Sequence, residues 1–148
     1  MRTQKSQSVI EFSWPVRVYY EDTDAGGVVY HTNYLKFMER ARTEWLRELG
    51  FEQDELKSEY DVIFAVRNVS IDYILPARFN DRLVVSVSVL EQARASLVLE
   101  QTIRKENKLG VLCQGQVKVV SLKASSFKPC PLPSNLTQIL SELILEKE

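Results

Sequence analysis

The sequence is poor in the residues that build metal and disulfide sites. Its 148 residues include one histidine, His31, and two cysteines, Cys113 and Cys130. A single histidine excludes a multi-histidine metal site, and the cysteines have neither metal-type spacing nor any need to pair. Cys113 falls in a strand pattern and is expected to be a small buried residue. We therefore expect no bound metal.

Charge imbalance and long apolar runs are also missing. The net charge is −1, so nothing global indicates nucleic-acid binding. No apolar run is long enough to cross a bilayer, and residues 1–13 contain no apolar core like that of a secretory signal, so we expect a cytoplasmic location. No repeat, linker or low-complexity segment divides the chain. Its length, with 45% hydrophobic and 26% charged residues, predicts one globular domain over residues 1–148.

One stretch, residues 19–49, organises the rest of the chain. It begins with a strand end and an acidic glycine turn, Asp22 to Gly27, and continues as a long amphipathic helix. Thr32 or Asn33 is the expected N-cap, and Gly50 is the expected stop signal. The apolar positions recur at helical spacing: Tyr34, Phe37, Met38, Ala41, Trp45, Leu46 and Leu49.

The remaining segments alternate in hydrophobicity with period two, which is typical of strands. We expect a loose start over 1–13, strands over 16–20, 62–73, 83–91, 97–104 and 111–119, a short helix over 51–60 and a final helix over 133–148. An irregularity, such as a bulge, is expected near Arg67 and Asn68. The order predicts an α+β fold in which a curved antiparallel sheet of about five strands wraps around one long central helix. The outer face and edges of such a sheet favour homo-oligomerisation.

Asp24 is the main candidate for chemistry. An Asp before Ala-Gly-Gly is most often a turn residue that accepts a bond from its own backbone. A carboxylate beside a helix N-terminus can also act as a general base or a nucleophile, while the helix-start amides accept an oxyanion. Gly26 and Gly27 allow backbone and ligand to come close. Asp22 shares the turn, and the spacing does not decide which carboxylate faces a cleft.

Other polar residues have both an ordinary and a functional interpretation. His31 either helps to cap the turn or acts as an acid, base or donor. Arg94 and Ser96 fall at a predicted hairpin, and Lys128 lies in a late loop. Such charges are usually solvated, but if they converge they can hold phosphates.

The run from Val16 to Thr43 resembles the hotdog-fold thioesterases of the 4-hydroxybenzoyl-CoA type, and most closely the YbgC-type acyl-CoA thioesterases associated with the bacterial Tol-Pal gene cluster. The signature reads Asp22-Thr23-Asp24-Ala25-Gly26-Gly27-Val28-Val29-Tyr30-His31, followed by Asn33-Tyr34 and Glu39-Arg40-Ala41-Arg42. The similarity continues to Pro131-Leu132-Pro133 and covers roughly nine tenths of the chain. The whole run is far more specific than a lone D-x-D.

The resemblance implies a hotdog fold, a dimer with active sites at the subunit interface, commonly paired into a tetramer, and hydrolysis of an acyl-CoA thioester. It implies no cofactor, coenzyme A being part of the substrate. It makes Asp24 the catalytic carboxylate and His31 its assistant, with the His31 backbone N–H polarising the carbonyl. Tyr30 and Asn33 would line the site, and Arg94, Ser96 and Lys128 would contact coenzyme A.

Other functions remain open at the level of the sequence. One is a binding module for acyl-CoA or acyl carrier protein, linked to the Tol-Pal system or phospholipid synthesis, with little turnover. The intact turn at Asp24 favours the enzyme, because binding alone does not need the acid. A hotdog dehydratase fits less well, since the acid precedes His31 in the turn and no second histidine exists. The acyl group, short-chain, fatty or aromatic, is not fixed.

Overall fold

The computed structural model describes residues 11–147, and it has the α+β architecture expected. Five strands and three α-helices follow one another along the chain, with one 3₁₀ turn before the long helix. In chain order they are β1 (Phe12–Arg17), η1 (Tyr20–Asp22), α2 (His31–Glu48), α3 (Gln53–Tyr60), β2 (Val62–Tyr73), β3 (Arg82–Gln92), β4 (Ser96–Lys105), β5 (Val111–Lys123) and α4 (Ser134–Lys147).

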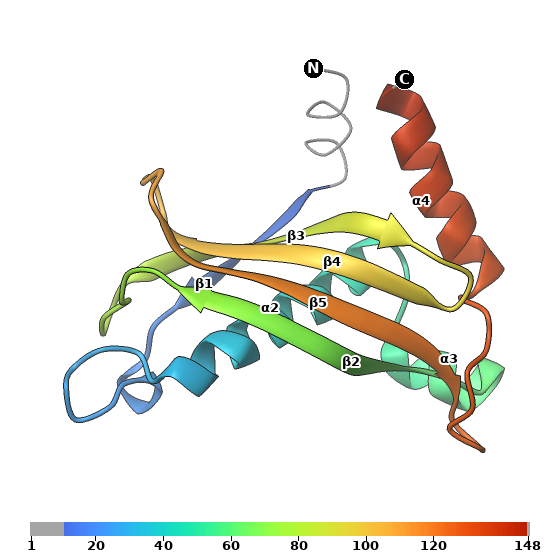
Figure 1. Ribbon diagram of the computed structural model, residues 1–148, viewed down its shortest axis with the longest axis horizontal. Helices are drawn as coiled ribbons and strands as arrows, with labels where there is room; N and C mark the ends of the chain where they lie inside the picture. Colours follow the sequence, from blue (N-terminus) through green and yellow to red (C-terminus); the bar gives the residue numbers. More distant parts are fainter. Residues whose placement is uncertain (1–10, 148) are drawn as a thin grey trace.

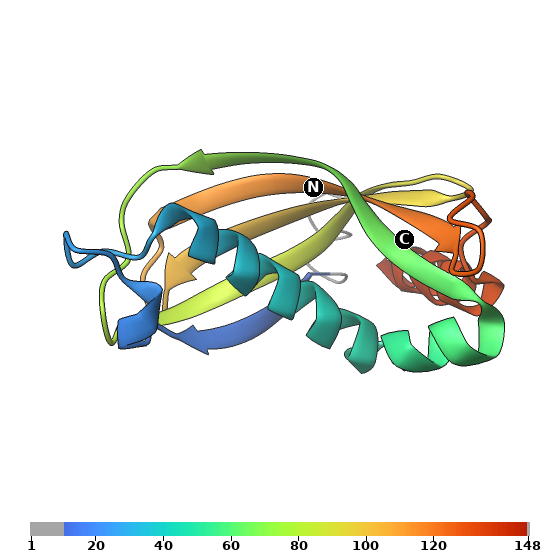
Figure 2. The ribbon, with the colours of Figure 1, turned by 90° about the horizontal axis from the view of Figure 1, so that it is seen from below.

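The five strands form one antiparallel sheet in the order β1-β3-β4-β5-β2. The sheet is strongly curved, and α2 runs along its hollow side (Figures 1 and 2). Helix α2 packs closest to β3 and β1, so the β5–β2 side of the hollow is less tightly covered by it. Helices α3 and α4 lie together at one end of the sheet (Figure 1). No helix among residues 11–147 combines the length and hydropathy needed to span a membrane.

Helix α2 forms because one of its faces is apolar and is buried by the sheet. Of the seven positions in the predicted stripe, all but Leu49 are buried. The helix ends as Gly50 predicts: Gly50 has φ +99°, its N–H donates to Arg47 O, and the Phe51 N–H donates to Leu46 O at 2.8 Å. This pair of bonds, with Leu46 and Phe51 both buried, is a Schellman motif.

The predicted boundaries at the start of the chain are wrong by several residues. Strand β1 begins at Phe12 inside the segment expected to be loose, whose residues 1–10 lie outside the described part, and it ends at Arg17 rather than at Tyr20. Helix α2 begins at His31 with Tyr30 as its N-cap, not Thr32 or Asn33. The pattern misled because Val18 is buried beyond the strand end, and because the Asn33 side chain bonds to Asp22 instead of to the helix.

Strand β2 is the long, irregular strand that the sequence predicts. Its pairing with β5 shifts register between Val66 and Asn68, which confirms the expected bulge. β2 is an edge strand, and several of its apolar side chains are solvent-exposed, including Val66 at 47% and Val69 at 39%. A long edge with exposed apolar residues is the kind of surface that natural proteins cover.

Candidate active site

The acidic glycine turn is a closed loop between η1 and α2. The Asp24 N–H donates to Val28 O at 2.9 Å, and the Gly27 N–H donates to Asp24 O at 3.0 Å. Gly27 has φ +81°, a conformation that residues with a Cβ rarely adopt. The Val29 N–H donates to Ala77 O at 2.8 Å, which fixes the loop to the connection between β2 and β3. The turn is therefore held by main-chain bonds at both ends.

The two aspartates of the turn have different surroundings. Asp22 is 5% exposed, and its carboxylate accepts bonds from the Tyr19 N–H at 2.8 Å and from Asn33 Nδ2 at 2.9 Å. Asp24 is exposed, and only its Oδ1 has a partner among the described residues, the Gly26 N–H at 2.8 Å. Asp22 therefore stabilises the turn through its two hydrogen bonds, while Asp24 has an accessible carboxylate.

The start of α2, which follows Asp24 by seven residues, presents free backbone donors. Within residues 11–147, the N–H groups of His31 and Thr32 have no acceptor. Unpaired amides at a helix N-terminus carry partial positive charge and bind anions and oxyanions. The chain thus places an exposed carboxylate and unpaired donors on one short segment.

Aromatic side chains surround the helix start. The His31 ring lies 4.5 Å from the Tyr30 ring and 6.1 Å from the Tyr73 ring, centroid to centroid. The Tyr73 hydroxyl donates to His31 O at 3.1 Å, so the end of β2 is tied to the first residue of α2. Buried Tyr34 completes the cluster; its hydroxyl accepts the Ala77 N–H at 2.9 Å, and burial raises its pKa. Tyr73 was not predicted as a site residue, although its position at the end of a long alternating strand was evident from the sequence.

The predicted site residues form two groups in the structure. Six lie in the turn and the first turn of α2: Asp24, Gly26, Gly27, Tyr30, His31 and Asn33. The other three, Arg94, Ser96 and Lys128, lie in or beside the β3–β4 hairpin and in the loop after β5.

These two groups are at opposite ends of the same sheet. At one end of the sheet, Ser96 of β4 pairs with Val120 of β5. At the other end, Ile103 of β4 pairs with Cys113 of β5, and Cys113 also pairs with Tyr73 of β2, which lies beside the start of α2. At roughly 3.3 Å per residue, Ser96 and Ile103 are about 23 Å apart along β4. The fold of one chain therefore does not bring Arg94, Ser96 and Lys128 to Asp24.

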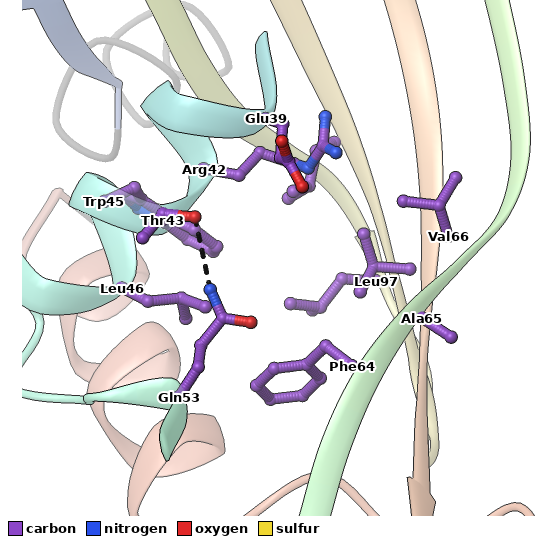
Figure 3. A pocket seen from close by; sticks show the side chains of 12 residues that line it. Glu39, Arg42, Thr43, Trp45, Leu46, Gln53, Phe64, Ala65, Val66 and Leu97 are labelled. Carbon is purple, nitrogen blue, oxygen red and sulfur yellow. Dashed lines mark hydrogen bonds between the residues drawn. The ribbon is translucent and has the colours of Figure 1, made fainter. Parts of the chain in front are cut away.

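A pocket of about 110 Å³ opens between α2 and the first half of β2 (Figure 3). Its walls are mainly apolar and include Trp45, Leu46, Phe64, Leu97 and Leu99. Glu39 and Arg42 lie side by side at one end, and Gln53 donates a bond to Thr43 at 3.2 Å at the other. The periodicity of the sequence predicted the apolar face of the helix, but it did not predict that a pocket separates this face from β2.

Comparison with known proteins defines the class to which this fold and site belong. The structure is similar to that of a 1,4-dihydroxy-2-naphthoyl-CoA thioesterase from Synechocystis, with a TM-score of 0.83, 26% identity, and coverage of 90% of this chain and 97% of the other. A family model described as "Thioesterase superfamily" matches residues 26–112. The fold is that of the hotdog thioesterases.

Curated sequences make the assignment more specific. The chain is 45% identical to the acyl-CoA thioesterase YbgC of Haemophilus influenzae over 84% of this chain and 90% of that protein. It is 47% identical to the acyl-CoA thioester hydrolase YbgC of Escherichia coli O6:H1, over 84% of this chain and 92% of that protein. The chain belongs to the thioesterase superfamily and, within it, to the acyl-CoA thioesterases of the YbgC group.

Proposed function

We propose that the protein hydrolyses the thioester of a short-chain or fatty acyl-CoA, with Asp24 as its catalytic carboxylate. The observation that carries this proposal is the pairing, on one short segment, of the accessible Asp24 carboxylate with the unpaired N–H groups of His31 and Thr32. Asp22 is engaged with two donors from the chain itself, which leaves Asp24 as the carboxylate available to a substrate.

The reaction divides the roles between the carboxylate and the helix start. The thioester carbonyl oxygen is held by the backbone N–H groups, which stabilise the negative charge that develops on it. Asp24 either attacks the carbonyl carbon to give a mixed anhydride that water then cleaves, or removes a proton from the attacking water. In both routes the C–S bond breaks, water supplies the new oxygen, and coenzyme A leaves as the thiol. The His31 side chain assists, and no cofactor is needed.

The working unit in this proposal is a dimer formed through the free edge of β2. A two-fold axis near the middle of this strand, at the bulge, pairs the two copies antiparallel. Such pairing satisfies the unpaired edge and covers Val66 and Val69. It also brings the Tyr73 end of β2, and with it the catalytic turn, beside the Val62 end of the partner strand.

The same symmetry accounts for the two separated groups of candidate residues. Ser96 pairs with Val120, which in turn pairs with Ala65 near the first end of β2. The two-fold therefore directs Arg94, Ser96 and Lys128 of one subunit toward Asp24 of the other. Cationic side chains there can bind the phosphates of coenzyme A. Pairing of two such dimers would give a tetramer.

The test is hydrolysis of an acyl-CoA panel, from short to long aliphatic and aromatic, by the wild type and by Asp24→Asn. Loss of the carboxylate should lower kcat by at least about a hundredfold, because it removes the base or nucleophile. Asp54→Asn is the matched control, since Asp54 is another exposed aspartate that accepts a backbone N–H, from Glu55 at 2.9 Å. The control should keep wild-type turnover, and size-exclusion chromatography should show an oligomer for all three proteins.

The outcomes separate enzyme from binding module. Normal turnover by Asp24→Asn would refute its catalytic role. Folded oligomers without turnover on any ester, combined with tight binding of acyl carrier protein, would instead favour a binding module with a role in the Tol-Pal system or phospholipid synthesis. The exposed turn carboxylate supports the enzyme, because binding alone does not require it.

We place this activity in the cytoplasm.

A further inference from the structure

The pocket between α2 and β2 is not used by the catalytic turn of its own subunit. Arg42 follows His31 by three turns of α2, so about 16 Å of helix separates them at 1.5 Å per residue. A volume of about 110 Å³ is several times the roughly 10–15 Å³ that admits one water, so the pocket has room for a short acyl chain but not a long one. Its apolar walls suit methylene groups.

One wall of this apolar pocket carries a charge. Arg42 Nη1 donates to Gln101 Oε1 at 2.9 Å, and Gln101, which is fully buried, donates through Nε2 to Met38 O at 3.0 Å. The Arg42 guanidinium has five N–H donors, and Gln101 holds it in place by accepting from one of them. Loss of solvent lowers the pKa of Arg42, as expected for a cation taken partly out of water.

No carboxylate of the described chain forms an ion pair with this guanidinium. Glu39 lies beside it (Figure 3), and its negative charge raises the pKa of Arg42, against the larger effect of burial. The Glu39 side chain is exposed, however, and within residues 11–147 no Arg42–Glu39 contact of 4.0 Å or less exists. A partly buried cation whose neighbouring carboxylate is exposed and out of contact is only partly compensated, and a ligand carboxylate would compensate it further through a charge-assisted bond.

We infer that this pocket binds an acyl group that ends in a carboxylate, and that Arg42 is the residue that selects it. The substrate class is a short dicarboxylic acyl thioester. Apolar walls contact its methylene groups, and the guanidinium donates to the terminal carboxylate. Hydrolysis then breaks the C–S bond as in any acyl-CoA, and the products are a free dicarboxylate and the thiol of coenzyme A.

This inference rests on the proposed function, because the pocket reaches a thioester only across the dimer. The proposed two-fold places the Tyr73 end of one subunit beside the Val62 end of the other, where Phe64 and Ala65 line the pocket. The thioester would lie at the helix start of one subunit, and the tail of the acyl group would extend into the pocket of its partner.

The test compares acyl groups matched in chain length, butyryl-CoA with succinyl-CoA and hexanoyl-CoA with adipyl-CoA. The wild type should have a kcat/KM at least about tenfold higher for the dicarboxylic member of a pair, since one charge-assisted bond is gained. Arg42→Met, which keeps an unbranched apolar stem and removes the charged guanidinium, should bring that ratio to one or below.

A second variant keeps the arginine and supplies the missing counter-ion. Gln101→Glu places a carboxylate where Gln101 Oε1 now accepts from Arg42, so it should also lower the ratio. It leaves no cavity, although the bond from Gln101 Nε2 to Met38 O is lost. Arg47→Met is the matched control: Arg47 is on the same helix, but it is exposed and bonds to Glu44 and Glu52. The control should leave the ratio as in the wild type.

The outcomes for the two proposals are distinguishable. A wild type that prefers the apolar member of each pair, or a ratio that Arg42→Met leaves unchanged, overturns the inference while thioester hydrolysis stands. A wild type that cleaves none of the four esters, nor any other member of an acyl-CoA panel, refutes the proposed function itself. Far-ultraviolet circular dichroism and chromatography of each variant identify any that fail to fold.

Discussion

The two aspartates of the glycine turn should fail in different ways when each loses its charge. Asp22 accepts from two donors, Tyr19 N–H and Asn33 Nδ2, and it is almost completely buried. In Asp22→Asn the amide oxygen can serve one donor, and the new NH₂ faces the other. A buried donor is left without an acceptor, which costs about 1–3 kcal/mol. A chain of this size loses about 2–4 °C in Tm per kcal/mol of stability, so a loss of about 2 kcal/mol should lower Tm by about 4–8 °C.

Asp24→Asn should behave in the opposite way. An asparagine oxygen can still accept the Gly26 N–H, and the position is exposed, so its stability should stay within about 0.5 kcal/mol of the wild type. Thermal unfolding by circular dichroism at one subunit concentration measures both variants, since the Tm of an oligomer depends on concentration. A Tm for Asp22→Asn equal to that of Asp24→Asn would refute the structural role assigned to Asp22.

Three further changes test the packing around the site. Tyr34→Phe removes the acceptor of the Ala77 N–H, which is buried, and should lower the free energy of unfolding by about 1–3 kcal/mol in urea titrations; an unchanged value would contradict this role of Tyr34. Gly115→Ala should lower it by about 1–3 kcal/mol in the same assay, because the new methyl group would lie 3.1 Å from a backbone oxygen of β2 and 3.4 Å from Met38 Cε. An unchanged midpoint would show that β2 and the Met38 side chain make room without cost. Burial raises the pKa of the Cys113 thiol to about 12, so the thiolate is scarce at pH 8. Iodoacetamide should therefore not modify Cys113 until the protein unfolds. Mass spectrometry of the peptide that contains Cys113 detects any labelling of the native state.

The long-range features of this fold follow from periodic signals in the sequence. Helix α2 was predicted with its buried face because its apolar stripe is wide, and the bulge in β2 was predicted because alternation changes phase beside Arg67. Segment ends were less predictable. Asn33 is a good N-cap residue by type, but in this fold its side chain bonds to Asp22, and tertiary contact overrides local preference.

The candidate site was predictable as residues but not as an arrangement. The spacing in the turn identified Asp22 and Asp24 together, and only the fold shows that one is buried and the other exposed. The contact between Tyr73 and His31 depends on where β2 ends relative to α2, which no local pattern encodes. Arg42 lies outside the predicted apolar stripe of the helix, yet it bonds to Gln101 of the sheet.

The strand order has a consequence for how the protein is made. Strand β1 is the first described strand of the chain, but its partner is β3, and Phe12 pairs with Val87. During synthesis β1 must therefore wait until more than half of the chain has left the ribosome. Contacts between residues so distant in sequence form slowly, on the millisecond-to-second scale typical of sheets dominated by non-local pairing. The glycine turn with Asp24 lies between β1 and α2, so the nascent protein should complete this candidate site only late in folding.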